Sequence, residues 1–149
     1  MDTVRSYTPR AADITRAWHV IDATGRPIGR LASETAQLLK GKHKPIYATH
    51  MDVGDYVVVI NAARVGVTGK NKAQQKMYYR HSGYPGALRA VSLQDMLARH
   101  PERVIEHAVH GMLPKNSLGR QMLRKLRVYA GPNHPHIGQV QAPAEVAKE

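Results

Sequence analysis

The run Tyr56-Val57-Val58-Val59-Ile60 decides the fold class of this chain. It holds four consecutive β-branched residues with no polar alternation, which is typical of a central strand covered on both faces. A strand of this kind needs helices above and below it, because neither of its faces suits water. The run therefore predicts an α/β domain with a largely parallel sheet.

Earlier residues supply a first strand and a first helix. Residues 18–22, Trp18-His19-Val20-Ile21-Asp22, predict a strand, and a glycine-rich turn follows from Gly25 to Gly29. From Ile28 to Leu39, apolar residues recur at helical spacing. The first forty residues thus predict a strand, a turn and a helix.

Later residues predict two weaker strands and several helices. The strands are expected at residues 76–80 and 127–129. One helix should begin after Ser92, where Asp95 completes a capping box, and another should begin at Pro101. Because no repeat or composition change divides the chain, residues 1–149 are expected to form a single domain. Its N-terminal arm would cover residues 1–17 and its C-terminal tail residues 138–149, and both are expected to be extended and basic.

Charge gives the first indication of function. The chain has 22 Lys and Arg residues against 11 Asp and Glu residues, a formal net charge of +11. These charges are segregated, since no acidic residue occurs between Asp55 and Asp95 or between Glu106 and Glu145. Such segregation favours a continuous surface that binds a polyanion, with a merely solvated basic face as the alternative.

Other classes of protein fit this composition poorly. No apolar run approaches the ~20 residues that a membrane span needs. The N-terminus lacks the order of a secretion signal, so a soluble cytoplasmic protein is expected. The absence of cysteine excludes disulfides and thiolate zinc sites.

The segment from Asn116 to Arg127 predicts a helix with an apolar face and a basic face. The apolar face comprises Leu118, Met122, Leu123 and Leu126, and the basic face comprises Arg120, Arg124 and Arg127. No Glu accompanies these arginines to form the pairs that a solvated helix usually carries. Since a guanidinium group can grip a phosphate bidentately or stack on a base, the segment predicts an RNA contact.

Motifs for catalysis are incomplete. Residues 67–72 resemble a phosphate loop around Gly69-Lys70, but Arg64 and Asn71 stand where that loop needs Gly and Ser or Thr. The spacing of Gly25 and Gly29 does not match a dinucleotide turn. The pairs His107 with His110 and His134 with His136 have no third ligand nearby in sequence, and a turn is the better interpretation of Asp52 and Asp55. No enzyme activity, cofactor, metal or small-molecule substrate is therefore expected.

Several motifs in order resemble one known family. They are Trp18-His19-Val20-Ile21-Asp22-Ala23, Gly29-Arg30-Leu31-Ala32, Gly41-Lys42-His43-Lys44-Pro45, Gly54-Asp55 with the strand to Asn61, Thr68-Gly69-Lys70, His81-Ser82-Gly83-Tyr84-Pro85-Gly86, Gly111-Met112-Leu113-Pro114-Lys115-Asn116, Leu118-Gly119-Arg120, Tyr129-Ala130-Gly131 and His134-Pro135-His136. Together they make most of the chain resemble the family of bacterial large-subunit ribosomal protein number thirteen. The first seventeen residues look longer than the compact family pattern.

The resemblance implies a three-layer α/β/α fold around a mainly parallel four-stranded sheet. It also implies contact with large-subunit rRNA and with neighbouring ribosomal proteins, and an early role in subunit assembly. Members of the family can also bind mRNA and repress translation, which the sequence leaves open for this chain. The residues expected to bind RNA are Arg26, Arg30, Lys40, Lys42, His43, Lys44, Lys70, Lys72, Lys76, Arg80, His81, Lys115, Asn116, Arg120, Arg124, Lys125, Arg127, His134 and His136.

Two other functions remain as alternatives at this point. A nucleoid protein or general RNA-binding protein would carry the same charge but would bind unrelated duplexes equally well. A nucleotide-using α/β enzyme would share the fold class but would need a phosphate cradle.

Overall fold

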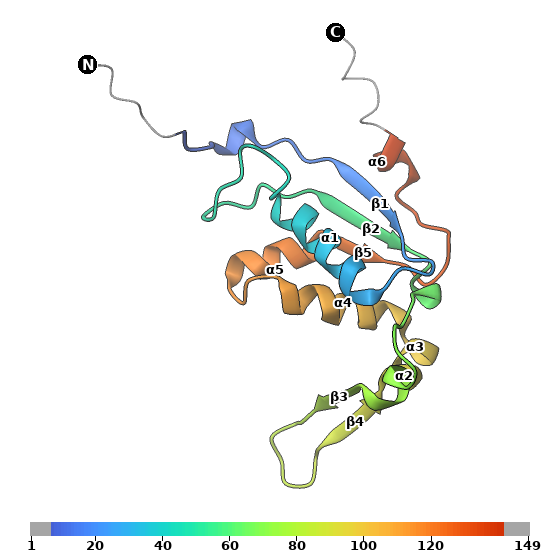
Figure 1. Cartoon of the computed structure of the whole chain (residues 1–149). Helices are drawn as coiled ribbons and strands as arrows, with labels where there is room; N and C mark the ends of the chain where they lie inside the picture. Colours follow the sequence, from blue (N-terminus) through green and yellow to red (C-terminus); the bar gives the residue numbers. More distant parts are fainter. Residues whose placement is uncertain (1–6, 142–149) are drawn as a thin grey trace, which may run out of the picture.

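A parallel sheet forms the centre of the computed structural model, which describes residues 7–141. Its strands are β1 (Trp18–Asp22), β2 (Tyr56–Ile60) and β5 (Leu126–Val128), in the order β1-β2-β5. Trp18 lies beside Tyr56, and Val57 lies beside Leu126. The α/β class, the parallel sheet and the central position of β2 are therefore confirmed (Figure 1).

Three helices form a layer on one face of this sheet. They are α1 (Ile28–Lys40), α4 (Pro101–Met112) and α5 (Ser117–Arg124), and α1 packs against α4. The buried stripe of α1 includes Leu31 and Leu39, both fully inaccessible, and it meets Val57 and Val59 in the main core. The helix ends at Gly41, whose φ of 79° is a left-handed conformation that glycine adopts without strain.

The opposite face of the sheet is covered by the C-terminal segment. Trp18 stacks on Tyr56 with 4.5 Å between ring centroids, and His136 stacks on Trp18 at 5.1 Å. The short helix α6 (Ile137–Gln141) contacts β1. Val58 points to this face and is fully buried. The central strand is thus covered on both faces, although α6 is the only helix that the described residues contribute to the second layer.

A separate hairpin replaces the fourth strand that was expected in the sheet. Strand β3 (Met77–Arg80) pairs antiparallel with β4 (Arg89–Ser92), flanked by the helices α2 (Lys72–Gln75) and α3 (Leu93–Arg99). Figure 1 shows this hairpin extending away from the central sheet. The prediction of a four-stranded sheet was therefore wrong for the residues described, because the strand at residues 76–80 pairs with its sequence neighbour.

Three boundaries also differ from the predictions. The helix expected to reach Arg127 ends at Arg124, and Arg127 lies in β5, where its backbone joins the parallel ladder with β2. Residues 138–141 belong to α6 rather than to an extended tail, and residues 142–149 lie outside the described residues. Within the arm at 1–17, residues 11–13 form a 3-10 helix, and residues 1–6 lie outside the described part. A second 3-10 helix spans Ala62–Arg64.

Candidate nucleic-acid interface

A buried carboxylate, Asp55, organises the basic loop that follows α1. Only 1% of Asp55 is exposed, and its oxygens accept a hydrogen bond from the Ala17 backbone N–H at 2.9 Å and from Lys44 Nζ at 2.5 Å. The Nε2 atoms of His19 and His43 lie 3.0 and 2.8 Å from the other oxygen of Asp55. Burial alone would raise the pKa of Asp55, but the hydrogen bonds from Lys44, Ala17 and His19 lower it below its usual value. His43 and Lys44 therefore anchor this loop to the sheet.

The same cluster is the one place among the described residues where side chains could converge on a metal. His19, His43 and Asp55 offer ligand atoms within 4.8 Å of one another. A cation there would have to displace hydrogen bonds to Asp55, and the Lys44 ammonium group beside the carboxylate would repel it. The donor set is thus better suited to a hydrogen-bonded ion cluster than to a metal.

Lys125 lies in the interior, and its predicted role changes as a result. Only 5% of the residue is exposed, and its ammonium group donates to Asp52 Oδ1 at 2.6 Å, to the Gly54 carbonyl at 2.8 Å and to the Leu39 carbonyl at 3.3 Å. Burial lowers the pKa of Lys125, while Asp52 favours its charged form. With its three donors used internally, Lys125 no longer belongs in the RNA-binding set.

A group of cations without internal partners lies where α4, α5 and β5 meet. A cleft of about 430 Å³ occurs there, which we call the β5-edge cleft. It is lined by Glu106, Arg120, Leu123, Arg124, Leu126 and Arg127. Within residues 7–141, no side-chain hydrogen bond or ion pair engages the three arginines. Their guanidinium groups are free to bind an external anion.

Local sequence explains how α5 presents these arginines. Asn116 Oδ1 accepts a hydrogen bond from the Gly119 N–H at 2.8 Å and caps the helix. Met122 is buried, and Arg120 and Arg124, one turn apart, are exposed. Arg127 reaches the same cleft from the strand rather than from the helix. The predicted basic face thus exists, with one of its members supplied by the sheet.

The hairpin offers a second exposed surface. Its side chains include Tyr79, 68% exposed, and its loop carries Tyr84, 77% exposed. Arg80 and His81 are exposed beside them, although His81 Nδ1 also accepts the Gly83 N–H within the loop at 2.9 Å. Aromatic rings interleaved with cations suit stacking on unpaired bases.

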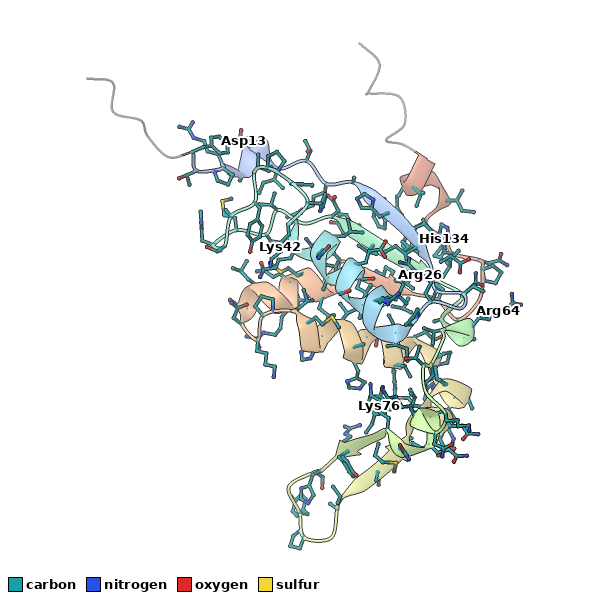
Figure 2. The ribbon with its side chains drawn as sticks, viewed as in Figure 1. Asp13, Arg26, Lys42, Arg64, Lys76 and His134 are labelled. Carbon is teal, nitrogen blue, oxygen red and sulfur yellow. The ribbon has the colours of Figure 1, made fainter. Side chains whose placement is uncertain are left out.

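The remaining predicted residues are dispersed over the molecule. Arg26 pairs with Glu34 near the start of α1, and Lys42 lies at the other end of that helix (Figure 2). His134 and His136 are half-buried, and His136 lies against Trp18 and accepts or donates a hydrogen bond with the Tyr129 hydroxyl at 2.9 Å. Lys40 is half-buried near the Tyr47 ring. The exposed remainder are Arg30, Lys70, Lys72, Lys76 and Lys115.

Sequence reasoning missed two features of this interface. It did not join Glu106 to the arginines of α5, since only packing of α4 beside β5 brings them together. It also assigned Asp55 to a turn, although the residue is the acceptor at the centre of the cluster with His19 and His43. The sequence signal that was available is the position of this carboxylate directly before the central strand.

The sequence of this chain is similar to those of known proteins over most of its length. None of the helices described is long and apolar enough to cross a membrane. The model of the family described as ribosomal protein L13 matches residues 16–135. A large ribosomal subunit protein uL13 from Thermobifida fusca (strain YX) is 57% identical over 145 residues, covering 97% of each chain. The uL13 protein of Streptomyces coelicolor is 56% identical over 97% of this chain and 98% of its own, and that of Roseiflexus sp. (strain RS-1) is 54% identical over 91% and 92%.

Proposed function

Because this chain belongs to the ribosomal protein L13 family, it is a structural constituent of the large ribosomal subunit and not an enzyme, and we propose that it binds large-subunit rRNA through its exposed basic surfaces. The observation that supports this proposal best is the set of three arginines around the β5-edge cleft, which have no partner within the described residues. Guanidinium groups left without acidic partners are well placed to replace the counterions along a phosphate backbone.

The proposed interface has two parts. The first is the β5-edge cleft, with Lys115 and Asn116 at the start of the helix that forms its wall. The second is the hairpin with the lysines at its base, including Lys76, which is labelled in Figure 2. In the lining of the cleft three arginines outnumber the one carboxylate of Glu106, and no acidic residue occurs between Asp55 and Asp95 in the stretch that includes the hairpin, so both parts carry a net positive charge.

Lys44 and Lys125 are assigned a different task in this proposal. Each ammonium group holds a loop around residues 52–55 against the sheet, through Asp55 and Asp52 respectively. These two lysines hold the backbone in place and so position the exposed cations that lie nearby. His43 acts in the same way, since its ring is engaged by Asp55.

We also propose an early role in subunit assembly, contacts with neighbouring ribosomal proteins, and binding of mRNA through the same basic surfaces. If one surface serves both rRNA and mRNA, free large-subunit rRNA should compete with mRNA for the protein. An exposed phosphate-binding surface recognises A-form shape and backbone in either RNA.

The test is a charge reversal at the cleft. Changing Arg120 and Arg124 together to Glu should weaken binding to large-subunit rRNA by at least about 100-fold and lower the slope of log affinity against log salt by about 2. Both side chains are exposed, so the free energy of unfolding should change little. The matched control is R99E/R103E, which makes the same change in net charge on exposed residues of α3 and α4.

The outcomes separate the candidate functions. Loss of rRNA binding in R120E/R124E alone would support the proposed interface. Equal losses in both double variants would indicate only nonspecific attraction, and equal affinity of the unaltered protein for unrelated duplexes would favour a general RNA-binding protein.

A further inference from the structure

The β5-edge cleft contains one residue that a phosphate site would not need. Glu106 lies in its wall with the three arginines, yet no ion pair within 4.0 Å joins this carboxylate to any of them. A carboxylate facing a phosphate would repel it and weaken binding. The oxygens of Glu106 can instead accept hydrogen bonds from donors of a ligand.

The floor of the cleft is apolar. Leu126 is only 7% exposed and Leu123 is half-buried, and both line the cavity. An aliphatic floor cannot satisfy a phosphate, but it can pack against the flat face of a base. The volume of about 430 Å³ falls within the ~300–1,000 Å³ typical of small-molecule sites.

Strand β5, at the edge of the sheet, contributes Leu126 and Arg127 to the lining of this cavity. Strand β5 lies at the end of the order β1-β2-β5, so one of its edges pairs with no strand among those described. The Val57 N–H donates to the Lys125 carbonyl, and the Tyr129 N–H donates to the Val59 carbonyl. Since bonded positions alternate along a parallel strand, the backbone N–H and C=O of Arg127 point toward β2. The backbone N–H and C=O of Leu126 therefore face the unpaired edge of β5, and Leu126 also lines the cleft.

From these features we propose that the β5-edge cleft receives a single unstacked RNA nucleotide and prefers guanine. The arginines bind the phosphates on either side of the nucleotide, and the base packs on Leu123 and Leu126. The Glu106 carboxylate accepts hydrogen bonds from the N1–H and the 2-amino group of guanine. This inference rests on the proposed rRNA binding and adds a base preference to it.

Guanine is favoured over the other bases by donor count. Its Watson–Crick edge presents two adjacent donors to a carboxylate, whereas adenine and cytosine each present one amino group and uracil presents one imino N–H. A bidentate, charge-assisted pair is stronger than a single hydrogen bond. Guanine is therefore expected to bind more tightly than each of the other three bases.

The experiment is an NMR titration of the full chain, freed of RNA in high salt. The methyl signals of Leu123 and Leu126 are followed during additions of guanosine 5′-monophosphate, uridine 5′-monophosphate and inorganic phosphate. We expect guanosine monophosphate to shift these signals and to bind about tenfold more tightly than uridine monophosphate, because one charge-assisted hydrogen bond separates them. Inorganic phosphate should leave the leucine methyl signals nearly unmoved.

Two variants test which part of the nucleotide each side chain binds. E106Q should lower the affinity for guanosine monophosphate to the level of uridine monophosphate, while R124Q should weaken both nucleotides. The control E102Q removes the same charge from α4 outside the cleft lining and should change neither affinity.

Each outcome of the titration supports or overturns the nucleotide site or its base preference. Equal binding of both nucleotides and inorganic phosphate would show a plain anion site and overturn the base preference, and unshifted leucine methyl signals would overturn the nucleotide site. Binding of large-subunit rRNA by R120E/R124E is measured separately. If that binding is lost while no nucleotide binds the cleft, the proposed function stands and this inference fails.

Discussion

Replacing Lys125 with Met should destabilise the fold strongly while leaving the exposed basic surface unchanged. Methionine has about the same length but cannot donate to Asp52, to the Gly54 carbonyl or to the Leu39 carbonyl. Losing the charge-assisted bond to Asp52 costs about 1.5–3 kcal/mol, and each carbonyl left without its donor adds about 1 kcal/mol. Relief of the cost of burying an ammonium group offsets part of this, so we expect a loss of about 3–5 kcal/mol in the free energy of unfolding.

Urea denaturation followed by tryptophan fluorescence would measure this loss. Trp18 is the only tryptophan and stacks on the Tyr56 ring, so its emission reports the integrity of the sheet. The control is K72M, an exposed lysine whose loss should change the free energy of unfolding by less than about 0.5 kcal/mol. In D52N/K125M the destabilisation should fall short of the sum of the two single variants by about 0.5–3 kcal/mol.

One result would refute this reasoning. If K125M unfolded within about 0.5 kcal/mol of the unaltered protein but bound large-subunit rRNA less tightly, Lys125 would be an RNA contact and its internal hydrogen bonds would carry little energy.

Two further predictions concern a glycine and a carboxylate. A methyl group on Gly119 would lie 1.7 Å from the Pro114 carbonyl oxygen, so Gly119→Ala should cost about 1–3 kcal/mol in thermal or urea unfolding, whereas Gly29→Ala, with open space around it, should be neutral or slightly stabilising. Hydrogen bonds from Asn61 and Thr24 lower the pKa of Asp22 from 3.8 to about 2, so its contribution to stability is complete above pH 3.8 and is lost as the pH falls through about 2. Asp22→Asn should therefore flatten the decline in unfolding free energy across that window, and an unchanged pH profile would contradict the assignment.

Elements specified by local patterns were predicted well. The apolar run at residues 56–60 and the short segment at residues 18–22 predicted β2 and β1 with their observed bounds. Ser92 caps α3 as expected, with its Oγ accepting the Asp95 N–H at 3.1 Å. Pro101 begins α4. In each case the determining interactions lie within a few residues of one another.

Features that depend on distant contacts could not be predicted in this way. Lys125 and Asp52 are 73 residues apart, and nothing in the sequence around Lys125 distinguishes a buried lysine from its exposed neighbours. Arg89–Ser92 has no strong β pattern, so its pairing with Met77–Arg80 depends on the hairpin as a whole. The sequence around Glu106 indicates only a helix, and its place in the cleft depends on the packing of α4 beside β5.

The position of β5 near the end of the chain also sets the order in which the protein can fold during synthesis. Strands β1 and β2 are complete once residue 60 has been made, but 65 residues separate Ile60 from Leu126. At ~5–20 residues per second, roughly 3–13 s pass with the second edge of β2 unpaired and open to contact with other chains. Pairing of β5 closes that edge and creates the β5-edge cleft in the same step. The nascent chain thus acquires this cleft only when the second edge of β2 is closed.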